Sequence, residues 1–132
     1  AEAEALSYCG ENNIAFLAYS PIAQGLLTGK MGPERTFAET DQRSRSKRFS
    51  AENRRRAAAL LDDLRPVAEA HEVTPAQLAI AWAVSQPGST HALVGARSVR
   101  QATENAAAGD VELTADEQAA IERALQAHSD VV

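Results

Sequence analysis

Two segments of this chain combine glycines with a basic residue directly after an apolar run. The first, residues 19–30, has the sequence YSPIAQGLLTGK, in which Gly25 and Gly29 precede Lys30. Glycines let backbone N–H groups approach an anion closely, and a lysine adds a compact positive charge. The segment is a candidate anion-binding loop, although a simple strand-to-loop turn with a surface lysine fits the same spacing.

The first segment does not match the phosphate-binding P-loop. That motif needs about four residues between its first glycine and a Gly-Lys-Ser/Thr triplet. Here three residues separate Gly25 from Gly29, and Met31 follows the lysine. A magnesium ion would lack its hydroxyl ligand, so we exclude P-loop chemistry.

The second segment, residues 95–105, has the sequence GARSVRQATEN. A turn at Gly95 leads into a predicted helix N-terminus, which favours a phosphate, and Arg97 is placed to grip that phosphate by two parallel hydrogen bonds. Helical spacing places three polar residues on one face, as suits the adenosine half of a nucleotide: Gln101, Glu104 and Asn105. The alternative is a capping box closed by Gln101 and a solvated polar face.

Other arrangements of reactive residues are not evident. His, Cys, Asp and Glu show no metal-ligand spacing, and no Ser-His-acid triad can be assembled. His71 stands at a predicted helix end, where its interaction with the dipole indicates a structural role. The run Arg54–Arg56 predicts a solvated helix face.

The length and composition are typical of one soluble globular domain. The chain has 132 residues, 45% apolar and 23% charged, with a net charge of -5, which gives no overall attraction for nucleic acid or anionic membranes. No apolar run approaches the roughly 20 residues of a membrane span. Residues 1–4 have neither the basic region nor the apolar region of a signal peptide, and no Met precedes them. Cys9 has no disulfide partner, as expected in a reducing cytoplasm, although a cysteine-free extracellular domain would look similar.

Two apolar strands must position these segments. Residues 14–19 are apolar on both faces, which is typical of a parallel strand covered by helices, and His91–Val94 forms a second strand closed by Gly95. Residues 1–11 predict the end of a helix. Between Met31 and Phe49 no periodicity is seen, and a loop of this length is usually functional or disordered.

Four further helices are predicted from their capping signals. Ser50 is an N-cap before an apolar stripe made of Ala57, Leu60, Leu61, Leu64, Val67 and Ala68. Thr74 opens a capping box for the helix Pro75–Gln86, which is apolar nearly all round and should be deeply packed. Ser98 and Thr114 open two further boxes. The first of these helices should turn Val99, Ala102, Thr103 and Ala106 inward, and the second Ile121, Ala124 and Leu125.

The order of elements predicts an α/β protein with a parallel sheet. Two strands cannot form a buried sheet by themselves, because each leaves an edge open. We therefore expect the chain to be part of a larger sheet. On its own it should be helical but loosely packed or self-associating.

Four stretches resemble the aldo-keto reductase superfamily. Residues 14–30, IAFLAYSPIAQGLLTGK, resemble its seventh strand and the following loop, and residues 37–43, FAETDQR, resemble the next loop of the bacterial and potassium-channel β-subunit-like branch. Residues 73–88, VTPAQLAIAWAVSQPG, resemble the penultimate barrel helix. Residues 92–117, ALVGARSVRQATENAAAGDVELTADE, resemble the eighth strand, its helix and the tail.

The resemblance implies that residues 1–132 are the C-terminal part of a (β/α)8 barrel, with strands seven and eight. It implies that the whole barrel transfers a hydride from NADPH to aldehydes and ketones. It implies that the nicotinamide-ribose and pyrophosphate stretch is lined by Ser20, Pro21, Ile22, Gln24, Gly25 and Lys30, and that Tyr19 stacks on nicotinamide. The 2′-phosphate and adenine would be held by Gly95, Arg97, Gln101, Glu104 and Asn105. The loop with Asp41 and Arg43 would close over the pyrophosphate.

One departure concerns catalysis. The family's catalytic Asp, Tyr, Lys and His lie on earlier strands, and nothing in this chain matches them. Tyr8 and Tyr19 do not qualify as the catalytic acid, since the family's tyrosine depends on a neighbouring lysine and histidine. This chain alone should be inactive. The alternative is a non-catalytic nucleotide-binding or assembly module of reductase-like fold.

Overall fold

A pair of short parallel strands lies at the base of the structure. The computed structural model describes residues 2–131, in which β1 (Leu17–Tyr19) pairs with β2 (His91–Leu93) in the register Ala18 to Ala92. Both strands are shorter than predicted, because each has one neighbour within the described residues and the ladder ends where that neighbour ends. Just before β1, the Phe16 carbonyl still accepts hydrogen bonds from the N–H groups of Thr90 and His91 at 3.0 and 3.1 Å.

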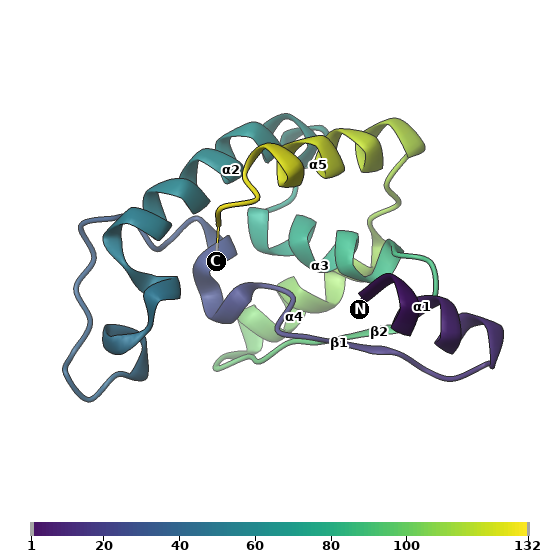
Figure 1. Cartoon of the computed structure of the whole chain (residues 1–132), viewed down its shortest axis with the longest axis horizontal. Coiled ribbons are helices and arrows are strands. Elements are labelled where there is room, and N and C mark those ends of the chain that lie inside the picture. Colours follow the sequence, from purple (N-terminus) through teal and green to yellow (C-terminus); the bar gives the residue numbers. More distant parts are fainter. Residues whose placement is uncertain (1, 132) are drawn as a thin grey trace.

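The helices form layers over one face of this pair (Figure 1). Helix α3 (Pro75–Ser85) contacts β2 on one side and α2 (Ala51–Ala70) on the other, and α2 packs along α5 (Ala115–Ala127). This is the right place for a helix that is apolar nearly all round. Its residues Leu78, Ile80 and Ala81 are buried, whereas Trp82 and Val84 are only half-buried, so the packing is less deep than predicted.

The capping signals are confirmed at three of the four helix starts. The Ser50 hydroxyl accepts from the Asn53 N–H at the start of α2. Thr74 and Gln77 form a complete capping box at α3, and Thr114 and Glu117 form another at α5. Ser98 also accepts from the Gln101 N–H, but the Gln101 amide accepts from the Arg97 N–H and not from Ser98, so the predicted box is incomplete.

Helix α1 (Glu2–Glu11) rests on the turn that precedes β2. Gly88 in this turn has a φ of 87°, and a Cβ added there would lie 2.2 Å from the Leu6 carbonyl oxygen. Only glycine allows this approach. The predicted helix end is confirmed for the described residues, since Asn12 and Asn13 leave the helix and Asn13 has a left-handed φ of 54°.

The predicted inward face of α4 (Val99–Ala107) is wrong. Val99 is 84% exposed, and Ala102, Thr103 and Ala106 are exposed too. The helix packs instead through its far end, where η4 (Ala108–Asp110) follows it and Ala108 is fully buried against α3. Nothing among the described residues covers the Val99 side.

The long loop after β1 is ordered by short 3-10 turns. These are η1 (Ala23–Thr28), η2 (Gln42–Arg45) and η3 (Lys47–Phe49). Leu26 of η1 and Phe49 of η3 are buried against Ala57 of α2, and Val131 packs on this cluster. The hydrophobic contacts thus attach both ends of the aperiodic stretch to α2.

The predicted solvated face at Arg54–Arg56 is wrong for its first residue. Arg54 is 5% exposed and donates hydrogen bonds to the carbonyl oxygens of Gly32 and Arg35, both at 2.7 Å. Arg55 is exposed, and Arg56 pairs with Glu52 and Asp130. A charge run in the sequence does not reveal that a distant loop folds over one of its members.

Neither a membrane segment nor a metal cluster is found in residues 2–131. None of their helices combines the length and apolar character needed to cross a bilayer. The His, Cys, Asp and Glu side chains in this range do not gather into a group that would hold a metal ion.

The first prediction concerns acid stability. Glu117 accepts hydrogen bonds from the Thr114 N–H, from the His71 ring at 2.9 Å and from the Thr114 hydroxyl, and these contacts hold the pKa of its carboxyl below the usual 4.5. A depressed pKa contributes stability above the unfolded value, and the contribution is lost as the pH falls through the folded pKa. The free energy of unfolding, measured in urea, should therefore fall more between about pH 5 and about pH 3 in the wild type than in Glu117→Gln.

Two features make Glu117→Gln a clean comparison. Glutamine can still close the capping box, so the cap itself survives. Glu122→Gln on the exposed side of the same helix is the matched control and should lose stability with acid as the wild type does. Equal acid losses in Glu117→Gln and the wild type would show that the carboxylate charge is irrelevant to stability.

The second prediction concerns association. Tyr19 is 81% exposed, Leu17 and Leu93 are about half exposed, and a hollow of about 200 Å³ beside Trp82 is lined mainly by apolar side chains. Open strand edges and exposed apolar patches promote self-association. Light scattering on the purified chain should therefore show a mass above that of a monomer or a broad distribution. A monodisperse monomer with a sharp, cooperative urea transition would contradict this expectation.

Candidate nucleotide-binding groove

The parallel pairing brings the two glycine-containing segments together. Tyr19 and Leu93 are the last paired residues of β1 and β2, so the chain leaves both strands at the same edge of the sheet. Ligands of parallel α/β proteins bind at this edge, because the connecting loops there are free to vary. Residues 20–30 and 94–98 emerge side by side as a result.

A groove with a volume of about 1120 Å³ runs between these two segments, and the chain at residues 40–43 and the N-terminus of α3 also line it. All the residues that the sequence analysis assigned to cofactor binding lie on its walls: Tyr19, Ser20, Pro21, Ile22, Gln24, Gly25, Lys30, Arg43, Gly95, Arg97, Gln101, Glu104 and Asn105. Residues far apart in sequence therefore share one surface.

The groove has further lining residues that the sequence analysis did not assign to it. These are Thr28, Met31, Arg35, Thr40, Gln42, Thr74, Pro75, Ala76, Leu93, Val94 and Ala96. Thr74–Ala76 could have been found from the capping box, since a helix that follows a parallel strand begins near the strand's carboxyl end. Arg35 carries no such signal, because its position depends on how the loop after Lys30 folds back.

The backbone after β1 is unusual. Ser20, Ala23 and Gln24 have φ values of 56°, 47° and 54°, in the left-handed region that L-residues rarely adopt, and Gly25 follows at 95°. Such conformations cost of order 1–3 kcal/mol each and gather at functional sites. The turn is fixed from within by the Thr28 hydroxyl, which donates to the Gly25 carbonyl at 2.7 Å. Successive left-handed residues also form concavities of backbone N–H groups that suit anions.

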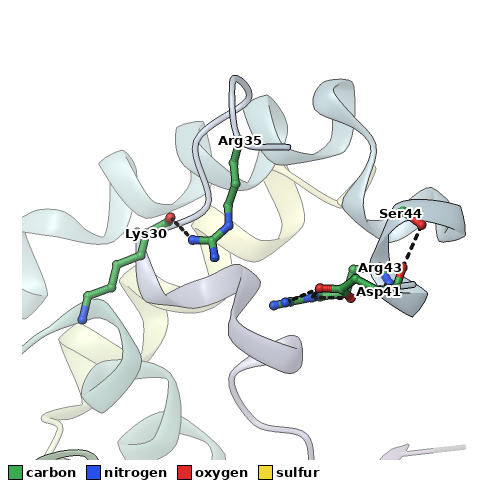
Figure 2. A network of polar contacts seen from close by, with 5 residues as sticks. All are labelled: Lys30, Arg35, Asp41, Arg43 and Ser44. Carbon is green, nitrogen blue, oxygen red and sulfur yellow. Dashed lines mark hydrogen bonds and ion pairs between the residues drawn. The ribbon is translucent and has the colours of Figure 1, made fainter. Parts of the chain in front are cut away.

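Asp41 and Arg43 form a closed ion pair on one wall (Figure 2). The Arg43 guanidinium donates from Nε and Nη2 to both Asp41 carboxylate oxygens, at 2.9 and 2.5 Å for the shorter contacts. The side chain and the N–H of Arg43 lower the pKa of Asp41 from its usual 3.8 to about 2. The same contact raises the pKa of Arg43. Arg43 is therefore held by its own loop and enters the groove with its charge partly balanced.

The second segment is organised around Gly95. The Asn105 amide donates to the Gly95 carbonyl at 3.4 Å, and the Gln101 amide accepts from the Arg97 N–H at 2.8 Å. Both polar side chains therefore stabilise the turn before α4 and still line the groove. Glu104 is half-buried and faces Arg100 at 3.6 Å. The Arg97 guanidinium, exposed beside the helix N-terminus, has no hydrogen bond or ion pair to any other described residue.

The groove is locally positive in an acidic protein. Four cationic side chains line it, namely Lys30, Arg35, Arg43 and Arg97, against two acids, Asp41 and Glu104, whereas the whole chain carries a net charge of -5. Charge of one sign gathered in a concave site concentrates ligands of the opposite sign. The geometry therefore suits an anionic ligand long enough to reach from Lys30 to Arg97.

Comparison with known proteins identifies relatives along nearly the whole chain. An uncharacterized oxidoreductase of Mycobacterium tuberculosis is 44% identical over 117 residues, which are 89% of this chain and 35% of that protein. The NADH-specific methylglyoxal reductase of Escherichia coli is 33% identical over 86% of this chain and 34% of that protein. A probable voltage-gated potassium channel subunit beta of Arabidopsis thaliana is 35% identical over 83% of this chain and 34% of that protein.

The fold has a matching solved structure. The glycerol dehydrogenase of Gluconobacter oxydans superposes on 93% of this chain with a TM-score of 0.84 and 32% sequence identity, and the match covers 37% of that chain. The chain thus spans about a third of the length of the relatives that it matches. Its two parallel strands and their helices correspond to part of an aldo-keto reductase barrel. The model of the aldo/keto reductase family matches residues 1–126, and the chain belongs to that family.

Proposed function

We propose that this chain is the cofactor-binding C-terminal part of an NADP-dependent carbonyl reductase, with β1 and β2 as barrel strands seven and eight. The observation that carries the proposal is the convergence of the predicted cofactor residues on one positively charged groove. When bound, NADPH supplies the hydride that reduces an aldehyde or ketone. The proposed location is the cytoplasm, which suits the single cysteine.

The fit to a dinucleotide can be followed along the groove. Beside β1, the exposed Tyr19 ring offers a flat surface on which nicotinamide stacks. The turn at Ser20–Gly25 and the Lys30 ammonium then bind the pyrophosphate, with Arg43 on the facing wall. Three cations and one acid line this stretch, namely Lys30, Arg35, Arg43 and Asp41, so the phosphates meet a net positive charge.

The adenosine end lies at α4. Arg97 stands beside the positive end of the helix dipole and has no competing partner, so its planar fork is free to bind a 2′-phosphate by two bonds. Glu104 and Asn105 are on the same helix face and accept hydrogen bonds from the adenine amino group. The anionic 2′-phosphate thus meets the cation Arg97, and the adenine amino group, a hydrogen-bond donor, meets the carboxylate of Glu104.

In a second candidate function, the groove binds nucleotide but the protein reduces no substrate. One relative is named as a potassium channel subunit, which favours an assembly module that binds nucleotide without reducing a substrate. The two functions share the nucleotide site and differ in carbonyl reduction by a protein that contains the whole barrel. Steady turnover of aldehydes by that protein supports the enzyme, and nucleotide binding without turnover supports the module.

The third prediction concerns activity of the chain alone. We expect no NADPH oxidation with a broad panel of aldehydes, because no residue here matches the family's catalytic Asp, Tyr, Lys and His, and reduction needs a proton donor. The measurement is the absorbance of NADPH with time. Turnover clearly above the blank that disappears in Tyr8→Phe or Tyr19→Phe would overturn the expectation.

The fourth prediction concerns cofactor choice. A charge-assisted contact to phosphate contributes about 1.5–3 kcal/mol, so Arg97→Ala should weaken NADPH binding by roughly ten- to a hundredfold and leave NADH nearly unchanged. Titration calorimetry on a barrel that contains the chain measures both ligands. Arg100→Ala is the matched control, because Arg100 lies three residues after Arg97, in the first turn of α4, but not on the groove wall. Equal losses for NADPH and NADH would make Arg97 a structural residue.

A further inference from the structure

Arg54 is a buried cation in a part of the chain that should favour solvent. It lies in the first turns of α2, is 5% exposed, and forms no ion pair with a carboxylate among residues 2–131. A buried charge without a counter-charge is unfavourable unless polar groups replace its lost water. The contacts of Arg54 therefore indicate which part of the chain it holds in place.

The guanidinium is held by the loop that follows Lys30. Its Nη1 atom donates to the carbonyl oxygens of Gly32 and Arg35, which are the two ends of a turn closed by the Arg35 N–H. One side chain of α2 thus fixes both ends of a turn about 20 residues earlier. The Nε atom has no hydrogen-bond partner among the described residues.

The same guanidinium lies on the ring of Phe37, with its carbon 5.3 Å from the ring centroid. Phe37 is also contacted by the guanidinium of Arg43, at 4.9 Å, and packs edge-on against Phe49. Phe37 therefore connects the buried cation to the cation of the groove wall. Arg43 in turn forms the ion pair with Asp41 on the groove wall.

The turn that Arg54 fixes also presents a groove cation. Arg35 lies on the groove wall, and its Nη1 atom donates to the Lys30 carbonyl at 3.4 Å, as Figure 2 shows. Arg35 contributes to the lowered pKa of Asp41, so the two charges lie within electrostatic range. Arg54 thus binds the turn that contains Arg35, and Arg35 in turn donates to the Lys30 carbonyl. Arg43 is connected to Arg54 through the Phe37 ring.

We propose that Arg54 is a positioning residue: through the Gly32–Arg35 turn and the Phe37 ring it holds the loop cations in place against the pyrophosphate stretch of the groove. The proposal rests on the proposed function for the identity of the ligand. Arginine suits the role better than lysine, because Nη1 donates to both carbonyls while the planar guanidinium lies against the Phe37 ring. A stabilising role alone would not require a connection to the groove.

The first test needs no ligand. Amide hydrogen exchange of the full chain compares the wild type with Arg54→Met, which keeps the apolar stem of the side chain but removes the donors and the charge. We expect exchange in residues 32–46 to be about tenfold faster in the variant, and exchange in α3 and α5 to be unchanged. Arg55→Met, on the exposed side of the same turn, should behave as the wild type. Unchanged exchange in 32–46, or equal acceleration throughout, overturns the proposal.

The second test separates positioning from general loss of structure. NADPH reaches the loop cations, whereas adenosine 2′-monophosphate, which has no pyrophosphate, occupies the Arg97 end. Arg54→Met should weaken NADPH about tenfold and leave the smaller ligand unchanged, and Arg54→Lys should not restore NADPH binding. The loss of NADPH affinity caused by Arg54→Met should be smaller in the Arg43→Ala background, since both residues act on the contact between Arg43 and the pyrophosphate.

The outcomes of the second test are distinct. Equal losses for both ligands, or fully additive losses with Arg43→Ala, overturn the positioning role. If neither ligand binds to the wild-type chain, the proposed nucleotide site fails in this chain, and the exchange experiment still decides whether Arg54 holds the loop.

Discussion

The parallel pairing of β1 with β2 is the constraint on which the rest of the structure depends. Parallel strands need a crossover connection, and here the connection contains the 3-10 turns, α2 and α3. Because the crossover stays on one face, α3 lies against the pair and α2 and α5 lie above it. The same pairing places both carboxyl ends at one edge, and the groove exists only because these two exits are neighbours.

Local signals in the sequence predicted the helices well. A capping box involves residues three positions apart, so Thr74 and Thr114 determine their helix starts without reference to the fold. The groove residues were also predictable, because a glycine turn after a parallel strand has one position in an α/β protein. Their assignment to particular parts of a cofactor came from family resemblance and not from spacing.

The errors share a physical cause, which is that burial depends on partners distant in sequence. Arg54 has the pattern of a solvated residue, yet the turn at Gly32–Arg35 covers it. Val99 has the pattern of a core residue, yet nothing in residues 2–131 covers it. For the same reason the strands are short, since an apolar run becomes a ladder only where another strand faces it.

Several departures from local rules lie beside the groove, although Asn13 and Glu72 are left-handed elsewhere. Helices α3 and α5 follow local rules: they begin with complete capping boxes and bury apolar side chains, as sequences selected for folding do. Beside the groove, Ser20, Ala23 and Gln24 adopt strained left-handed conformations, and Arg54 keeps a charge and an unpaired Nε in the interior. Each feature is unfavourable for stability by itself, and each has the effect of fixing backbone or cations along the same wall. Places where local preference is overruled are often functional, and the three left-handed residues beside the groove are such an observation, independent of any resemblance between sequences.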